Sequence, residues 1–341
     1  MRRLVGGVVL ALVLVALVAA GAYVAAEQWY RRPIAALTAA RVIEVPPRAS
    51  LGAIATLLAA QGLIEYPRLW ALIARRDGKA TRIRAGEYEV VPGTSPAGLL
   101  DLVISGRVLL HPVTLVEGWT CAAALAAIQA NPVIRRTLGP VPDAALMSEL
   151  GSPGVACEGE LAPDTYLMPR GATDLEVLKL AHARLKDRLA TAWLKRRADL
   201  PLATPYDALI LASIIEKETG TPEERPRIAA VFMNRLRRGM RLQTDPTVIY
   251  GMGSAYQGTI RRRDLTTDTP YNTYTRDGLP PTPIALPSAA AIEAAVQPAD
   301  SDELYFVATG RGDGRHEFSR TLDEHNAAVA RYLARLRNPG S

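Results

Sequence analysis

The chain has 341 residues, of which 49% are hydrophobic and 22% are charged, and it carries a net charge of +6 at neutral pH. This length and apolar fraction indicate about two domains plus attachments and allow a sizeable core. The basic residues are spread along the chain and are not interleaved with aromatics, so no nucleic-acid partner is expected.

The first feature along the chain is an uncharged apolar stretch at residues 4–26, long enough to cross a bilayer as a helix. Trp29 and Tyr30 follow it, as aromatic residues do at a membrane interface. The alternative is a cleaved signal peptide, because residues 20–22 resemble a cleavage site. We expect a retained single-pass anchor with residues 1–3 in the cytoplasm, residues 27–40 as a linker and the bulk of the chain outside.

Residues 41–107 predict a small α+β module. A strand pattern at 42–45 is followed by a helix pattern at 51–62 and a second helix that starts at Pro67, and then by a strand and turn at 85–93 and a helix at 95–106. Residues 85–103 resemble part of a LysM-type carbohydrate-binding unit. The alternative is a spacer that positions the next domain of the chain.

Residues 108–337 predict a larger α+β domain, followed by a tail at 338–341. A polar loop before a helix at 173–197 offers Glu158 and Tyr166 as site residues, although turn and capping roles fit that loop equally well. Cys121 and Cys157 either form a disulfide or remain thiols, and the sequence leaves this open. The four histidines and two cysteines show no metal-binding spacing, so neither a metal nor a cofactor is expected.

Residues 204–253 predict two consecutive helices at the centre of this domain. Thr204, Pro205 and Asp207 form a helix start, and Gly220 is a plausible stop. Thr221 and the residues after it repeat the start signal, so a second helix is expected to run to about Gly239.

Glu218 is the candidate general acid. It lies at helical spacing from Ile210, Leu211, Ile214 and Ile215, so it projects from an apolar face, whereas Glu216 lies nearly opposite. A carboxylate on an apolar face loses solvation, its pKa rises, and it can hold a proton near neutral pH. The alternative is that Glu218 turns to water or pairs with Arg225 or Arg227.

The residues after the second helix are candidates for sugar binding. Gln243, Thr244 and Asp245 form a polar segment before a strand-like run at 247–250. Further on, Tyr271, Asn272 and Tyr274 combine aromatic faces for sugar C–H surfaces with an amide for N-acetyl groups. The alternative for both tyrosines is a half-buried place in the core. The remaining patterns predict a helix at 288–295, strands at 303–308 and 316–319, and a last helix to about 336.

Several long motifs resemble the endolytic murein (peptidoglycan) transglycosylases, the YceG-like family. They are EGW at 117, PDTY at 163, ASIIEKETGTPEER at 212, VFMNRLRRGMRLQTDPTVIYGMG at 231, YNTYTRDGLPPTPIALPS at 271 and YFVATGRGDGRHEFSRTLDEHN at 305. The resemblance implies a bacterial inner-membrane protein with its catalytic domain in the periplasm.

The resemblance also implies an activity. Such enzymes cleave the β-1,4 bond between N-acetylmuramic acid and N-acetylglucosamine within nascent glycan strands, leaving 1,6-anhydro-muramyl ends and limiting strand length beside the penicillin-binding polymerases. The family's catalytic glutamate falls on Glu218 of EKET, with Glu216 left as a supporting or solvent-facing residue. Two alternatives remain. One is a muramidase-type hydrolase in which Asp245 activates water, and the other is a membrane-anchored wall-binding scaffold without catalysis.

Overall fold

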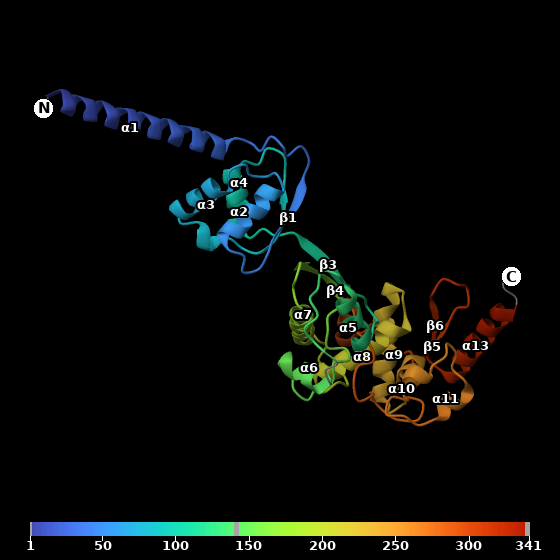
Figure 1. The fold of residues 1–341 in the computed structure, drawn as a ribbon. Coiled ribbons are helices and arrows are strands. Elements are labelled where there is room, and N and C mark those ends of the chain that lie inside the picture. Colours follow the sequence, from blue (N-terminus) through green and yellow to red (C-terminus); the bar gives the residue numbers. More distant parts are fainter. Residues whose placement is uncertain (1, 140–142, 338–341) are drawn as a thin grey trace. The chain divides into compact units, whose positions relative to one another are not determined.

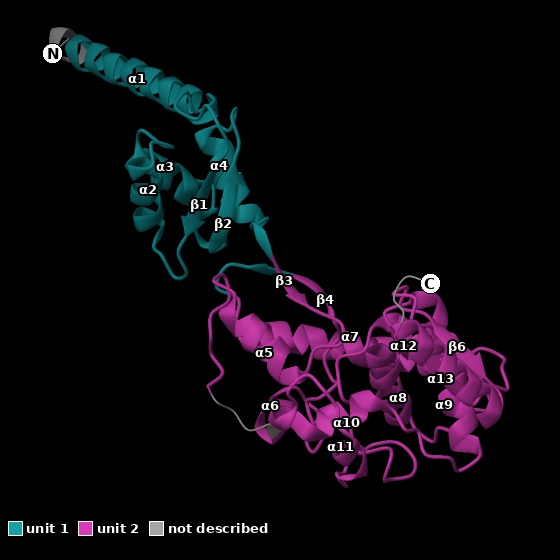
Figure 2. Cartoon of the chain, turned by 90° about the vertical axis from the view of Figure 1, so that its right-hand side faces the viewer, with its two compact units in different colours: residues 1–111, 167–171 teal, residues 112–166, 172–341 magenta. Residues whose placement is uncertain are grey.

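The computed structural model describes residues 2–139 and 143–337, so Met1 and the expected tail at 338–341 lie outside the described residues. The fold is mixed α+β, with two-stranded sheets among many helices (Figure 1). The chain divides into two compact units (Figure 2). Unit 1 comprises Met1–His111 and Leu167–Gly171, and unit 2 comprises Pro112–Tyr166 and Ala172–Ser341.

Unit 1 begins with helix α1 (Arg2–Arg31), whose segment Gly6–Arg31 is long and apolar enough to cross a membrane. The strands β1 (Arg41–Val45) and β2 (Gly86–Val90) pair antiparallel, and they alternate with α2 (Leu51–Ala60), α3 (Pro67–Arg76) and α4 (Pro96–Ser105). This order is the one expected from the sequence. Trp70 and Tyr88 are fully buried in the core, where the Trp70 indole N–H donates to the carbonyl of Pro96 at 2.9 Å.

Unit 2 is organised around α8 (Pro205–Glu218), whose residues 208–215 are all buried. Its start is the expected one, because Thr204 and Asp207 form a capping box and Pro205 occupies the first turn. Around it pack α7 (Asp174–Leu194), α9 (Arg225–Arg237), α10 (Asp245–Met252) and α12 (Ala289–Val296). The other helices of this unit are α5 (Cys121–Ala130), α6 (Asp143–Glu149), α11 (Arg262–Thr266) and α13 (Leu322–Arg337), and the strands β5 (Tyr305–Ala308) and β6 (His316–Ser319) form a hairpin. The strands β3 (Leu110–Leu115) and β4 (Asp164–Pro169) pair with each other, and each has residues in both units.

The strand-like run expected at 247–250 is helical, and that prediction was wrong. Residues Asp245–Met252 form α10, with Pro246 in its first turn. An acidic residue followed by proline is a helix start, and it outweighs a short run of β-branched and aromatic residues.

Cys121 and Cys157 form a disulfide, which settles the alternative that the sequence left open. The bond joins the first residue of α5 to the polar loop that precedes β4. The carboxylate of Glu158 accepts a hydrogen bond from the Cys121 backbone N–H at 2.9 Å, so the loop is fixed to α5 at two adjacent points.

Candidate active site

Glu218 is the last residue of α8 and lines a cavity of about 420 Å³. The helix ends there because Thr219 takes an extended conformation, which leaves the Glu218 side chain at the edge of the apolar core. The other residues of the cavity wall come from α9 and the segment after it, from the start of α10, from the 271–274 segment, from β5 and from α13. They are Arg235, Leu242, Gln243, Asp245, Tyr274, Tyr305, Phe306, Val307, Leu322, His325 and Val329.

Burial raises the pKa of Glu218 to about 7, and the nearby charge of Asp245 acts in the same direction. The hydroxyl of Thr244, which donates to Glu218 Oε1, and the charge of Arg235 act in the opposite direction. Desolvation is the largest of these effects, so Glu218 holds its proton close to neutral pH. The expected cause of the raised pKa, an apolar environment, therefore agrees with the structure.

The alternative partners of Glu218 are engaged elsewhere. Arg225 faces Glu216, with Nη2 3.7 Å from Oε1, and Arg227 pairs with Glu303. Glu216 is itself buried, with 6% of its side chain exposed, and it accepts a hydrogen bond from the backbone N–H of Ser288 at the start of α12. Glu216 is therefore a supporting residue and does not face solvent.

The polar segment after α9 supplies three neighbours of Glu218. Gln243 and Asp245 lie in the cavity wall, and Thr244 is buried with its hydroxyl on Glu218. Gln243 has a φ of 52°, in the left-handed region that a residue with a side chain seldom adopts. Such backbone strain is concentrated at functional sites, where surrounding contacts hold it in place.

Tyr274 is the one aromatic of the 271–274 segment in the cavity wall. Its hydroxyl donates to Asp245 Oδ1 at 2.6 Å, and burial together with this bond raises the pKa of Tyr274. Asn272 is 1% exposed, and its amide donates to the backbone carbonyls of Asp264, Leu265 and Thr267. It organises the loop that presents Tyr274, whose backbone N–H donates to the Asn272 side-chain oxygen at 2.9 Å.

The remaining predicted residues lie outside the wall of this cavity. Glu158 Oε2 accepts from the Tyr250 hydroxyl at 3.1 Å, and the Tyr250 ring contacts that of Tyr271 with their centroids 4.7 Å apart. Tyr166 is 4% exposed on β4 and donates to the carbonyl of Ala162 at 2.7 Å. Direct contact of Glu158, Tyr166, Tyr271 and Asn272 with a ligand remains a prediction.

The cavity wall also contains residues that the sequence reasoning missed, notably Arg235, Tyr305 and His325. A signal for Arg235 was available. It follows Ile228, Val231 and Phe232 at helical spacing, so it is a charge on an apolar face, which is the pattern that identified Glu218. Tyr305 and His325 carry no comparable local signal, because a strand and a helix distant in the chain bring them to the cavity.

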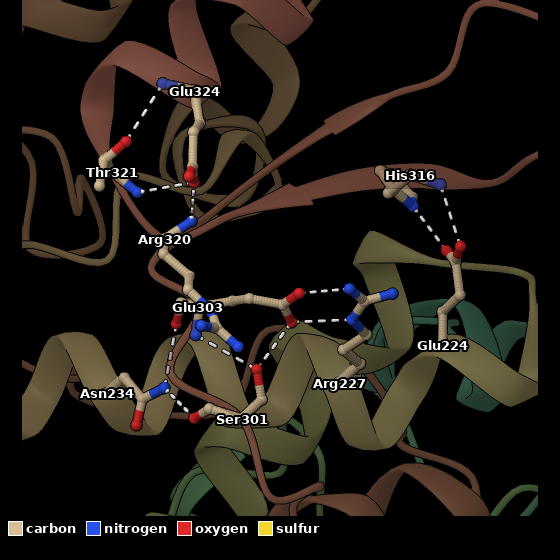
Figure 3. Close-up of polar contacts among 9 residues, drawn as sticks. All are labelled: Glu224, Arg227, Asn234, Ser301, Glu303, His316, Arg320, Thr321 and Glu324. Carbon is tan, nitrogen blue, oxygen red and sulfur yellow. Dashed lines mark hydrogen bonds and ion pairs between the residues drawn. The ribbon is translucent and has the colours of Figure 1, made fainter.

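The segment before β5 is fixed to α9 by polar contacts (Figure 3). Glu303 pairs with Arg227 and accepts from Ser301, and the Asn234 amide donates to the carbonyls of Ser301 and Glu303 at 2.7 and 3.0 Å. On β6, His316 makes two hydrogen bonds to the carboxylate of Glu224. These contacts hold the hairpin, and hence Tyr305, against the helix that carries Arg235.

A single carboxyl group that stays protonated near neutrality, in a cavity lined by hydroxyl, amide and aromatic groups, defines a site for acid/base chemistry on a polar ligand. Among the described residues, no group of three or more His, Cys, Asp or Glu side chains could hold a metal ion.

Comparison with known proteins identifies the family of the chain. Residues 43–331 match the model of the YceG-like family, and the chain belongs to that family. It is 30% identical to an endolytic murein transglycosylase of Bacillus subtilis, over 86% of this chain and 84% of that protein. It is 27% identical to an endolytic murein transglycosylase of Streptococcus pneumoniae, over 85% of this chain but only 58% of that longer protein. The crystal structure of a YceG-like protein from Listeria monocytogenes matches 84% of this chain and 98% of that chain, with a TM-score of 0.53 and 28% identity.

Proposed function

We propose that the protein is an endolytic murein transglycosylase, a lyase that cleaves the β-1,4 bond between N-acetylmuramic acid and N-acetylglucosamine within glycan strands. The observation that carries the proposal is the place of Glu218, a carboxyl group at the end of a buried helix, in the wall of a cavity of about 420 Å³, where burial raises its pKa. The membership of the YceG-like family and the names of the relatives supply the substrate and the reaction.

Glu218 serves first as the acid and then as the base. Its proton goes to the glycosidic oxygen as the bond from that oxygen to the muramyl C1 breaks, and the 2-acetamido group stabilises the positive charge at C1. The Glu218 carboxylate then removes the proton of the muramyl C6 hydroxyl, whose oxygen bonds to C1. The products are a free 4-hydroxyl and a 1,6-anhydro end, Glu218 regains its proton, and no water is consumed.

The neighbours of Glu218 suit this cycle. Thr244 donates to Oε1, which leaves Oε2 to carry the proton and gives the carboxylate a hydrogen bond once the proton has left. The attacking hydroxyl belongs to the substrate, so its effective concentration is high and no second carboxylate is required. Gln243, Asp245 and Tyr274 are placed to orient the sugars.

The proposal extends to the rest of the chain. The span Gly6–Arg31 supports a single-pass anchor in the inner membrane, with the catalytic unit in the periplasm, where a disulfide such as Cys121–Cys157 persists. The strand and helix order of residues 41–107 supports a LysM-like, glycan-binding role for unit 1. A place beside the penicillin-binding polymerases follows from a substrate that is still being synthesised.

Product analysis tests the proposed reaction. Uncrosslinked glycan strands are digested with the wild type and with Glu218→Gln, and the new ends are identified by mass spectrometry. We expect 1,6-anhydro ends from the wild type only. Reducing ends would instead favour hydrolysis with Asp245, which lines the same cavity, as the group that activates water. Identical digests from both proteins would favour a non-catalytic scaffold.

A further inference from the structure

Arg235 is a buried cation in the cavity wall without an acidic partner. It is 7% exposed, and its Nε and Nη1 groups donate to the carbonyls of Leu304 and Leu242 at 2.7 and 2.8 Å. It forms no ion pair with any carboxylate in the part of the chain that the structure describes, and its Nη2 group donates to no described residue. Nη1 also donates to the carbonyl of Arg241 and to Gln243 Oε1, at 3.2 and 3.3 Å. Nη2 is not an enclosed atom, so it is the N–H group of Arg235 that stays open to an acceptor from a ligand.

His325 brings a second free donor to the same place. Its ring stacks on that of Tyr305, with the centroids 5.1 Å apart and the planes at 22°, and the guanidinium of Arg235 lies 5.2 Å from the centre of the same Tyr305 ring. Burial and the charge of Arg235 lower the pKa of His325, so the imidazole is neutral and carries one N–H.

The surroundings of the imidazole decide which nitrogen carries that proton. Nδ1 is buried and has no hydrogen-bond partner among the described residues, whereas Nε2 is neither enclosed nor bonded to a described residue. An N–H on Nδ1 would be buried without an acceptor, whereas an N–H on Nε2 is free to donate to water or to a ligand. We therefore assign the proton to Nε2, the ring nitrogen that is not enclosed.

We propose that Arg235 Nη2 and His325 Nε2 together bind a carbonyl oxygen of a substituent on the saccharide. The inference rests on the proposed function, because it names the substrate group that this wall of the cavity contacts. Both side chains line the same cavity and contact the Tyr305 ring, whose centroid is 5.1 Å from that of the His325 ring and 5.2 Å from the guanidinium carbon of Arg235. The Tyr305 ring supplies an apolar surface beside them. Two groups of peptidoglycan offer the required oxygen, namely the 2-acetamido carbonyl of either sugar and the lactyl carbonyl of the muramyl residue.

Binding measurements with His325 variants test this contact. The full-length protein in detergent, carrying Glu218→Gln to prevent turnover, is titrated with uncrosslinked peptidoglycan strands. His325→Phe keeps the ring stacked on Tyr305 and removes the donor, so we expect the Kd to rise roughly tenfold. His325→Gln returns an amide N–H to the place of Nε2 and is expected to recover most of the affinity. Asn326→Ala, at an exposed neighbour on α13, is the control and leaves the Kd unchanged.

Two further ligands identify the carbonyl. If it belongs to the 2-acetamido group, the effect of His325→Phe persists with chito-oligosaccharides and disappears with de-N-acetylated strands. If it is the lactyl carbonyl, the effect disappears with chito-oligosaccharides. An equal loss with all three ligands, or no loss with intact strands, overturns the inference. The proposed reaction is tested by a different measurement, the chemical analysis of the ends that the protein with intact Glu218 forms. The proposed carbonyl contact can therefore fail while the proposed reaction holds, and the reverse.

Discussion

Glu218 and Glu160 are two glutamates of unit 2 whose pKa burial raises to about 7. Glu218 lines an open cavity, whereas Glu160 is 7% exposed and lies against His182. The Nδ1 atom of His182 is 2.9 Å from the Glu160 carbonyl oxygen and 3.4 Å from Oε2, and its Nε2 is 2.9 Å from Ser152 Oγ. Desolvation thus produces the same pKa in both places. Access to a ligand is what makes one of them a candidate for chemistry and the other a part of the core.

The largest expected effect comes from Glu218→Gln. The amide keeps the shape of the side chain but has no proton to transfer, so release of 1,6-anhydro products should fall by about a thousandfold. The same change in Glu160 should leave the rate within about threefold, because Glu160 acts on no substrate in the proposed reaction. Rates are measured by quantifying anhydro ends, and thermal unfolding confirms that both variants are folded. Equal losses in the two variants would break the distinction between them.

Glu216 supplies a third case, a buried glutamate with protein partners on α8. Glu216→Ala removes the acceptor for the Ser288 N–H and leaves Arg225 buried beside no carboxylate, so the free energy of unfolding should fall by about 3 kcal/mol. Denaturant titration measures the loss. Activity per folded molecule should stay near that of the wild type. A variant of normal stability that lacks activity would instead place Glu216 in the chemistry.

The third prediction concerns Glu160 and pH. Its pKa in the folded protein, about 7, lies above the ordinary value of 4.5, so the folded state holds the proton more tightly than the unfolded state does. This contribution to stability is complete below about pH 4.5 and is lost as the pH rises through 7, which amounts to on the order of 3 kcal/mol.

Glu160→Gln should remove that loss. The variant gains stability relative to the wild type between pH 5 and pH 8, as measured by denaturant titration at each pH. Asp187→Asn, the same substitution type at an exposed carboxylate on α7, is the control. A constant difference between Glu160→Gln and the wild type across this range would show that Glu160 does not bind a proton more tightly on folding.

The local parts of the fold were predictable from the sequence and the long-range parts of the site were not. The start of α8 follows from Thr204, Pro205 and Asp207, because a capping box involves only neighbouring residues. The apolar face that suggested Glu218 was a weaker guide, since α8 is buried on all sides and Glu216 is buried as well. What separates the two glutamates is the packing of other elements, which leaves a cavity beside one and places α12 against the other.

The part of the cavity wall formed by Tyr305 and His325 could not be predicted from the sequence either. Tyr305 reaches the cavity through the hairpin that Glu303 and Asn234 fix to α9, and His325 reaches it on α13. No spacing within a helix or strand encodes such a meeting. Arg235 could have been predicted in part, because it is a charged residue on the apolar face of α9, the same pattern that identified Glu218 on α8.

The smallest expected effect separates the two influences on the pKa of Glu218. Burial raises that pKa and the Thr244 hydroxyl lowers it, so Thr244→Val should raise it further. Because the acid is needed in its protonated form, the rate falls as the pH rises through this pKa. The alkaline limb of the pH–rate profile should therefore move upward by roughly half to one pH unit, and the maximal rate should fall severalfold as the carboxylate loses a hydrogen bond.

Thr247→Val is the matched control for this variant. Thr247 is a fully buried threonine on α10 whose hydroxyl donates to the Thr244 carbonyl at 2.7 Å, so it tests the loss of a nearby buried hydroxyl that does not donate to Glu218. It should lower the stability without moving the alkaline limb. If the alkaline limb of Thr244→Val does not move, the Thr244 hydroxyl does not contribute to the pKa of Glu218, and desolvation sets it. The pKa of Glu218 and that of Glu160 would then have the same cause, and the two residues would differ only in the cavity beside Glu218.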